Sequence, residues 1–350
     1  MYFAFTEEQE EFRASLRRLL TERAPSARVR EVLDAGHDPM LWKLLVQDMG
    51  LPGLHVPEEY GGQGFGYLET AVVFQELGRA LAPVPMAAST FAIEAILRCG
   101  TEEQRRSLLP GLASGERIGA LAVTGARPDD AVRVDGDRLH GKVNWVAHGH
   151  VADVLVVPAD GGLYVVEKGA PGLTVERVDS LDLTRPVSTL VLEGVPAQRL
   201  GADGVERVLD VARTLLAFEA LGAAEQCLDI SVEYAKTRVQ FNRPIGSFQG
   251  IKHLCAEMAI EIDASLGAAM YAAMILDEDP VEFAQVATLA KAQAAETVRQ
   301  CAEGMIQVHG GIGFTWEHDS HLYYRRAKAI EVWLGGVTEL RDLLADRVGI

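Results

Sequence analysis

The sequence predicts an α+β protein in which helices come first, a β-sheet module follows, and a second group of helices ends the chain. Before residue 112 and after residue 205, apolar residues recur every three or four positions, the period of an amphipathic helix. Between these regions, short runs rich in Val and Leu alternate with Asp-Gly and Gly-Gly turns, as antiparallel strands do. A chain of 350 residues, 48% of them hydrophobic, has enough apolar material for several subdomains.

The first predicted domain, residues 1–112, is helical. Its apolar periodicity is clear in "FRASLRRLL" and again in "YLETAVVFQEL". The Gly- and Pro-rich segment "GLPGLHVPEEYGGQGFG" interrupts the pattern and predicts a long loop between helices.

The second predicted domain, residues 113–204, is an antiparallel β module. It contains the runs "AVRVDGDRLHGKVNWV", "ADVLVVPA", "GLYVVEK" and "STLVLEGV". The third, residues 205–350, returns to long helical segments that are apolar over wide faces, such as "VARTLLAFEALGAAEQCLDISVEYAKTR". Wide apolar faces indicate helices packed against other helices, and we expect a four-helix bundle.

Composition argues against several classes of function. A net charge of -17 opposes binding to nucleic acid or to anionic lipid, and we expect neither nucleic acid nor membrane as a partner. The four cysteines are far apart and form no CxxC pair, which fits reduced thiols in a cytoplasmic protein. The N-terminus is acidic and lacks the pattern of a secretory signal.

The glycine-rich and histidine motifs do not predict a nucleotide loop or a metal site. "HGGIGF" and "YGGQGFG" are not GxGxxG and do not follow a predicted strand, so we interpret them as turns. The nine histidines form no HExxH pattern, and no metal site is expected.

Two segments near the C-terminus combine residue types that suit a nucleotide cofactor. Arg238-x-x-Phe241, at the end of a predicted helix, offers a guanidinium beside an aromatic face. Gln307-x-x-Gly310-Gly311 offers an amide and a backbone that a ligand can approach closely. The alternative interpretations are a surface salt bridge with a core phenylalanine, and a helix C-cap.

Together, "RVQFNRPIGSFQ" and "QVHGGIGF" resemble the acyl-CoA dehydrogenase family, and the resemblance covers nearly the whole chain. "PEEYGGQGFG" is similar to a loop of the family's N-terminal domain, and "GKVNWVAHGHVAD" to its flavin-contacting strand. The resemblance implies a helical N-terminal domain, a β middle domain and a C-terminal four-helix bundle, in agreement with the periodicity.

The resemblance also implies an FAD enzyme that desaturates an acyl-CoA thioester and passes electrons to an electron-transfer flavoprotein. In the family, FAD lies across a subunit interface. Arg238 would pair with the pyrophosphate of the FAD held by a neighbouring subunit. Further residues bordering that FAD would be Phe241, Phe248, Gln249, Gln307, Gly310 and Gly311. Thr124 and Trp145 would instead face the isoalloxazine in this chain's own site.

The family's catalytic base is missing from both of its usual positions. Aligning "WLGGVTEL" with the family's "YEGT" stretch places Gly335 at the position of the catalytic glutamate. The alternative position in other members corresponds to Ala212. The threonine that usually follows the flavin-strand tryptophan is replaced by Ala147, and the loop "TGARPDD" has lost the family's Glu-Pro and Gly-Ser elements.

Glu219 is the one carboxylate that could replace the base. It lies close to two helical turns after Ala212 and so shares a helix face with it. Its apolar neighbours in "LLAFEALGAA" predict a raised pKa suited to a base. The alternative is a buried structural carboxylate paired with Arg213 or with a partner chain. Weaker candidates, expected to be capping or surface charges, are Asp182, Asp319 and Glu339.

Three functions are consistent with this pattern. The chain could be the FAD-lending subunit of a heteromeric α2β2 acyl-CoA dehydrogenase, resembling the subunit without the usual glutamate in enzymes that shorten steroid side chains. It could be a self-sufficient homotetramer that uses Glu219, or a catalytically inactive structural or flavin-binding paralogue. The sequence does not specify the acyl chain.

Overall fold

The computed structural model of the protein describes residues 4–127, 131–276, 278 and 280–350. The N-terminal region is helical, as predicted, and two of its helices begin with capping boxes in which Thr6 and Thr101 bond to Gln9 and Gln104. Its elements are α1 (Glu7–Arg23), α2 (Ser26–Glu31), α3 (Pro39–Gln47), η1 (Leu51–Gly53), η2 (Glu58–Tyr60), α4 (Tyr67–Arg79), α5 (Met86–Cys99) and α6 (Glu102–Ala113).

The middle region consists of two four-stranded sheets, with strand orders β1-β4-β5-β8 and β2-β3-β7-β6. The strands are β1 (Gly119–Leu121), β2 (Val132–Asp135), β3 (Arg138–Ala147), β4 (Val154–Ala159), β5 (Gly162–Glu167), β6 (Leu173–Val178), β7 (Val187–Pro196) and β8 (Gln198–Arg199).

The pairings in these two sheets are antiparallel except one, since β1 runs parallel to β4, with Gly119 opposite Val154. The β module is therefore confirmed, with this exception to the antiparallel prediction. The physical reason is connectivity. Strands joined by a tight hairpin must run antiparallel, but β1 and β4 are not consecutive and no hairpin constrains their direction.

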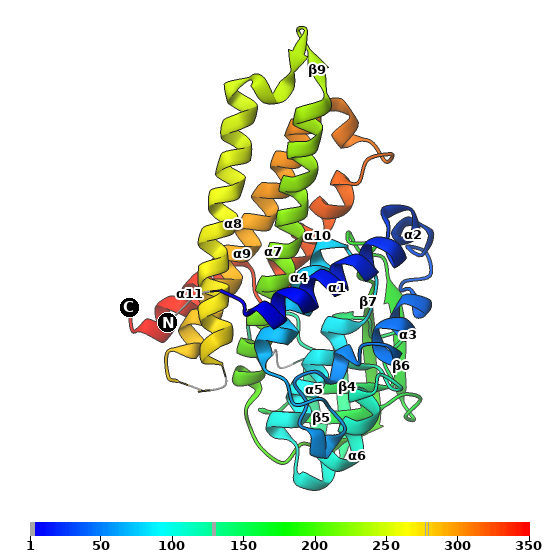
Figure 1. The fold of residues 1–350 in the computed structure, drawn as a ribbon. Helices are drawn as coiled ribbons and strands as arrows, with labels where there is room; N and C mark the ends of the chain where they lie inside the picture. Colours follow the sequence, from blue (N-terminus) through cyan, green and yellow to red (C-terminus); the bar gives the residue numbers. More distant parts are fainter. Residues whose placement is uncertain (1–3, 128–130, 277, 279) are drawn as a thin grey trace.

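The C-terminal region is helical, as predicted, and the long helices α7, α8 and α9 stand side by side (Figure 1). Its elements are α7 (Val205–Thr237), β9 (Val239–Gln240), β10 (Arg243–Pro244), η3 (Ile245–Ser247), α8 (Gln249–Ile275), α9 (Phe283–His309), η4 (Gly310–Phe314), α10 (Ser320–Val332) and α11 (Val337–Val348). The shorter α10 and α11 both pack on α9 in place of a fourth long helix. The helical path is interrupted between α10 and α11 at Leu334 and Gly335, whose φ angles are 61° and 113°.

The N-terminal helices and the bundle share one hydrophobic core, in which α4 and α7 are in backbone contact. A Cβ built on Gly78 would lie 2.0 Å from the carbonyl oxygen of Glu219, and one on Gly222 would lie 1.8 Å from that of Gln75. Only glycine permits this approach. The contact fixes the part of α7 that carries Glu219.

Helix α8 is long and apolar enough to cross a membrane, with a mean hydropathy of 1.4 over its most apolar window. One side of α8 packs on α7 and α9, and 44% of that window is buried. We therefore interpret α8 as a bundle helix.

Candidate functional site

The hairpin β9–β10 lies at one end of the bundle (Figure 1) and carries an exposed aromatic group. Phe241 and Asn242 have φ angles of 51° and 60°, and two positive φ angles are what a type I′ turn requires. The Phe241 side chain is 87% exposed, which rules out the core role considered from the sequence. Its ring meets that of Phe248 edge-on, with centroids 6.0 Å apart, and the Arg243 guanidinium lies 4.0 Å from the Phe248 ring centroid.

Arg238 ends α7 just before this hairpin and is exposed. Its backbone is fixed by hydrogen bonds to Tyr234 and from Ile245. Within the described residues, its guanidinium forms neither a hydrogen bond nor an ion pair, so the surface salt bridge considered from the sequence is not formed there. A fixed backbone with a free guanidinium suits an anionic ligand.

The second cofactor segment lies at the end of α9. Gln307, Gly310 and Gly311 are exposed, and a Cβ added to either glycine would meet open space. Gly310 caps α9 with a φ of 62°, so the C-cap interpretation is correct and leaves a bare backbone facing outward.

A ring stack joins the two segments. His309 lies directly before Gly310 and stacks on Tyr234, one turn before Arg238 in α7, with ring centroids 4.3 Å apart. His309 Nδ1 lies 2.8 Å from the Met305 carbonyl oxygen. Arg238 and Gly310 thereby belong to one end of the bundle.

Thr124 follows β1 and Trp145 lies in β3, so both belong to the middle region. Thr124 is half-buried, and its carbonyl accepts a hydrogen bond from the Leu334 backbone at 2.7 Å. Trp145 sits at an irregularity of β3, with a φ of 63° and 57% of its surface exposed. Residues 128–130 of the "TGARPDD" loop lie outside the described residues.

Gly335 occupies the loop between α10 and α11. At its φ of 113° an L side chain is strained, and a Cβ would lie 2.8 Å from both Ala126 Cβ and Leu340 Cδ2. Its carbonyl accepts a hydrogen bond from Lys291 Nζ at 2.5 Å. Burial, and after it the nearby Arg213 charge, lower the pKa of Lys291 to about 7. The loop conformation therefore disfavours a glutamate at this position.

Ala212 is fully buried in α7. The neighbouring Arg213 is also buried and forms hydrogen bonds to the loop that contains Gly335 and to Ala126. Arg213 donates to the carbonyls of Leu334, at 3.3 Å, and Ala126. It also pairs with Asp210 at 2.7 Å. Arg213 is therefore not the partner of Glu219, contrary to the alternative considered from the sequence.

Glu219 lies in a buried charge cluster. Its Oε1 accepts from Arg326 at 2.5 Å and from Arg185, and Arg326 pairs in turn with Asp182 at 2.6 Å. Each of these four side chains is at least nine-tenths buried. The prediction of an apolar environment for Glu219, made from its sequence neighbours, is therefore wrong. Two guanidinium groups from distant segments face the carboxylate.

The space beside Glu219 is small. A cavity of about 20 Å³ is lined by Glu219, Arg185, Arg326, His148 and apolar side chains of the N-terminal domain. A cavity of this size does not accommodate an acyl chain beside Glu219 in this conformation.

The weaker carboxylate candidates are capping or paired groups. Asp319 precedes α10 and accepts from Ser26 at 2.6 Å and from Arg30 at 2.7 Å. Glu339 accepts from the backbones of Ala126 and Gly336, both at 3.2 Å. Asp182 is not a surface charge, because it is buried against Arg326.

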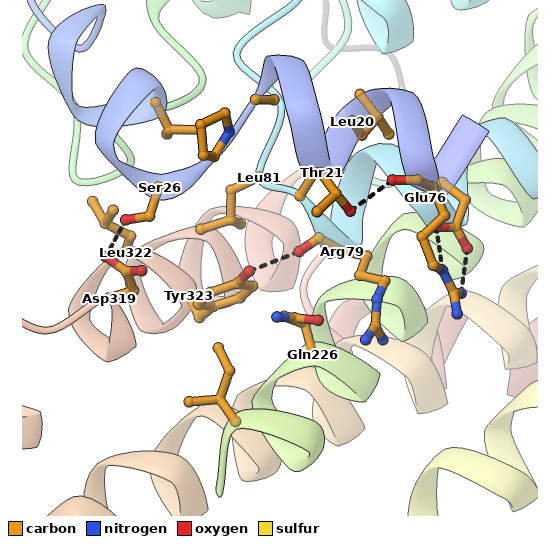
Figure 2. A pocket seen from close by; sticks show the side chains of 16 residues that line it. Leu20, Thr21, Ser26, Glu76, Arg79, Leu81, Gln226, Asp319, Leu322 and Tyr323 are labelled. Carbon is orange, nitrogen blue, oxygen red and sulfur yellow. Dashed lines mark hydrogen bonds and ion pairs between the residues drawn. The ribbon is translucent and has the colours of Figure 1, made fainter. Parts of the chain in front are cut away.

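A larger cavity of about 250 Å³ lies between α1, α4, α7 and α10 (Figure 2). Its charged groups are paired within the protein: Arg17 with Glu76 at 2.6 Å, and Asp319 with Ser26 and Arg30. The Tyr323 hydroxyl donates to the Arg79 carbonyl at 2.7 Å. The Arg79 guanidinium pairs with Asp229 at 2.5 Å. Every charged side chain lining this cavity in the described part of the chain is therefore paired within the protein.

Two family profiles match the chain. The acyl-CoA dehydrogenase N-terminal domain matches residues 6–116, and the acyl-CoA dehydrogenase C-terminal domain matches residues 200–349. The acyl-CoA dehydrogenase IpdE2 of Mycobacterium tuberculosis is 37% identical over 323 residues, which cover 92% of this chain and 91% of that protein. The chain belongs to the acyl-CoA dehydrogenase family. Members of this family are FAD-dependent oxidoreductases.

Two further acyl-CoA dehydrogenases are informative. FadE34 of the same organism is 39% identical over 291 residues, which cover 82% of this chain but only 39% of FadE34. A solved structure described as a variant of the Tcur3481–Tcur3483 steroid ACAD superposes with a TM-score of 0.92. It is 35% identical, and the match covers 98% of each chain.

The residues present fit one side of an FAD site. At the bundle end, a free guanidinium, exposed aromatic rings and bare glycine backbone suit a dinucleotide. In the middle domain Trp145 is present, but buried Ala147 supplies no hydroxyl where the family has threonine. The residues at the bundle end therefore suit a dinucleotide better than the residues around Trp145 suit an isoalloxazine.

Proposed function

We propose that this chain is the FAD-lending subunit of a heteromeric acyl-CoA dehydrogenase and that a homologous partner supplies the catalytic base. One observation supports the proposal: Gly335, at the position that the sequence resemblance assigns to the base, has a conformation that disfavours glutamate, whereas Gly310 and Gly311 at the bundle end leave a bare backbone open to a ligand. The assembly would desaturate an acyl-CoA thioester between Cα and Cβ.

In such an assembly this chain binds and orients the cofactor. Arg238 would pair with the pyrophosphate, because a guanidinium fork matches phosphate oxygens. Phe241, Phe248 and Gln249 would border the adenine, and Gln307 would complete the pocket with the backbone of the two glycines. When bound, FAD accepts the β hydrogen of the substrate as hydride.

The relatives support a two-chain enzyme. The name Tcur3481–Tcur3483 of the solved steroid ACAD joins two proteins. FadE34 matches this chain over only 39% of its own length, which leaves room for a second unit of similar size in one polypeptide. The Tcur3481–Tcur3483 structure is described as a steroid ACAD, which supports a steroid-derived acyl-CoA as the substrate class. An α2β2 assembly, an electron-transfer flavoprotein as acceptor and a cytoplasmic location are part of the proposal.

The self-sufficient homotetramer has less support. It requires Glu219 to approach a substrate, but the carboxylate is held by two arginines beside a cavity of about 20 Å³. A purely structural paralogue would have no reason to keep an unpaired Arg238 and a bare glycine backbone at the bundle end. An inactive flavin-binding paralogue would keep both, and it differs from the proposed subunit in giving no active pair on co-expression.

The test is expression of the chain alone and together with a homologous acyl-CoA dehydrogenase encoded beside it. We expect the lone chain to be colourless and inactive, and the pair to be yellow and active, with native mass spectrometry showing one FAD for each pair of chains. A lone chain that is saturated with FAD and desaturates acyl-CoA would overturn the proposal.

A further inference from the structure

In and beside the charge cluster around Glu219, two polar atoms have no hydrogen-bond partner among the residues that the structure describes. These are Nε2 of His148 and Nη1 of Arg185. His148 is 3% exposed and Arg185 6% exposed, so bulk water does not solvate either side chain. A buried donor or acceptor without a partner is costly, so native structures nearly always supply one.

Both unpartnered side chains line the same cavity of about 20 Å³, and Glu219 lines it with them. The two hydrogen bonds that Glu219 accepts both end on Oε1, which leaves Oε2 able to accept a third. Three polar side chains thus line one small space. The number matches a buried water, which makes about three hydrogen bonds.

The volume and the charges identify the ligand. A cavity needs roughly 10–15 Å³ of probe-occupied volume to hold one water, so about 20 Å³ accommodates a single molecule. The cluster has two positive groups, Arg185 and Arg326, and two negative groups, Glu219 and Asp182. A cation would meet the Arg185 donor and an anion would meet Glu219, so a neutral ligand is favoured.

The chemistry of His148 agrees with a neutral donor and acceptor. Burial, and after it the charge of Arg185, hold the pKa of His148 well below its usual value. The imidazole is therefore neutral, with one nitrogen that donates and one that accepts. A water can donate to Nε2 or accept from it, whichever tautomer is present.

We propose that one ordered water binds in this cavity, accepts a hydrogen bond from Arg185 Nη1, donates to Glu219 Oε2 and pairs with His148 Nε2. The site lies where three regions meet, since His148 and Arg185 come from the middle domain, Glu219 and Arg326 from the bundle, and the apolar walls from α4 and α5. The water completes a polar connection across this junction. The inference is independent of the proposed function.

The direct test is a crystal structure of the protein, alone or with its partner, at a resolution that shows ordered water. We expect a single density peak within hydrogen-bond distance of Arg185 Nη1 and His148 Nε2. A bromide soak should give no anomalous peak there. Absence of density, or an anomalous bromide peak, overturns the proposal.

A pair of variants at Ala87, a wall of the cavity, tests the energetic role. Ala87→Val fills the space with methyl groups and expels the water, so the Tm should fall by about 2–4 °C because buried polar groups lose their partner. Ala87→Ser adds a hydroxyl that can share or replace the water, so its Tm should stay within error of the parent. If the valine variant is more stable than the parent, the cavity holds no water and the proposal fails.

Discussion

The rings of Tyr234 and His309 are stacked, with centroids 4.3 Å apart, and this contact joins the last turns of α7 and α9. Each helix ends in one half of the proposed cofactor surface, Arg238 after the first and Gly310 after the second. Residues far apart in the sequence therefore form one surface, and each half is testable separately.

Replacing Arg238 by alanine should weaken FAD binding in the assembled enzyme. The guanidinium is free of internal partners, so the change removes a charge-assisted contact worth about 1.5–3 kcal/mol and little else. This corresponds to roughly 10- to 150-fold weaker binding, measured by flavin fluorescence on titration of the apoenzyme. Lys236→Ala is the matched control, because Lys236 is an exposed cation two residues away that pairs with Glu233. Equal FAD affinity in both variants would show that Arg238 does not contact the cofactor.

Installing glutamate at Gly335 should not create an active lone chain. The positive φ and the close Ala126 and Leu340 side chains oppose any Cβ, at a cost of about 1–3 kcal/mol. Gly335→Glu should therefore lower the Tm without giving dehydrogenation. Gly335→Ala, which carries the backbone cost without the carboxylate, should lower the Tm by a similar amount. A glutamate variant that is as stable as the parent and desaturates acyl-CoA would contradict this.

Replacing Glu219 should affect stability rather than catalysis. Glu219→Ala leaves the Arg185 and Arg326 charges without their shared partner, and breaking a buried ion pair costs about 3–5 kcal/mol. Urea unfolding should show this loss, and Glu233→Ala, which breaks an exposed pair on the same helix, should cost less than about 1 kcal/mol. Activity per assembled complex should be retained in Glu219→Gln. Loss of activity without loss of stability would identify Glu219 as the base.

Acidification should destabilise the folded chain through His150, a middle-domain residue whose ring centroid lies 6.4 Å from that of His37 in the N-terminal domain. Burial, followed by the charges of Arg177 and His37, lowers the pKa of His150 to about 4, from an unfolded value near 6.5. The unfolded chain binds the proton first, so this stability is complete above pH 6.5 and is lost as the pH falls through about 4. The Tm measured between pH 7.5 and 4.5 should fall less steeply in His150→Asn. An unchanged slope would mean that other groups govern the acid response.

The architecture was predictable because it depends on periodicity. Long amphipathic runs and Gly-rich turns predict where helices give way to strands, and the structure confirms this order. The parallel pairing of β1 with β4 was not predictable, because it depends on the path of the chain between them. The domain boundaries proposed from the sequence remain a prediction.

The candidate site was predictable only where its residues belong to one short sequence motif. Arg238 and Phe241 belong to one short segment, so their proximity is encoded locally. The environment of Glu219 is not, because its partners come from a loop of the middle domain and from α10. "YYRRAK" contains the decisive Arg326, but nothing in that segment indicates which carboxylate it meets.

The exposed aromatic hairpin has a consequence for production of the protein. Phe241 is 87% exposed and held in a turn with positive φ, so a chain without its partner displays an apolar side chain at the end of the bundle. Val239 and Phe314 are exposed as well, so Phe241 is not the single apolar group at this end of the bundle. In the proposed heteromer a partner would cover such groups, and a cell would then limit aggregation of surplus copies by synthesising both subunits in equal numbers.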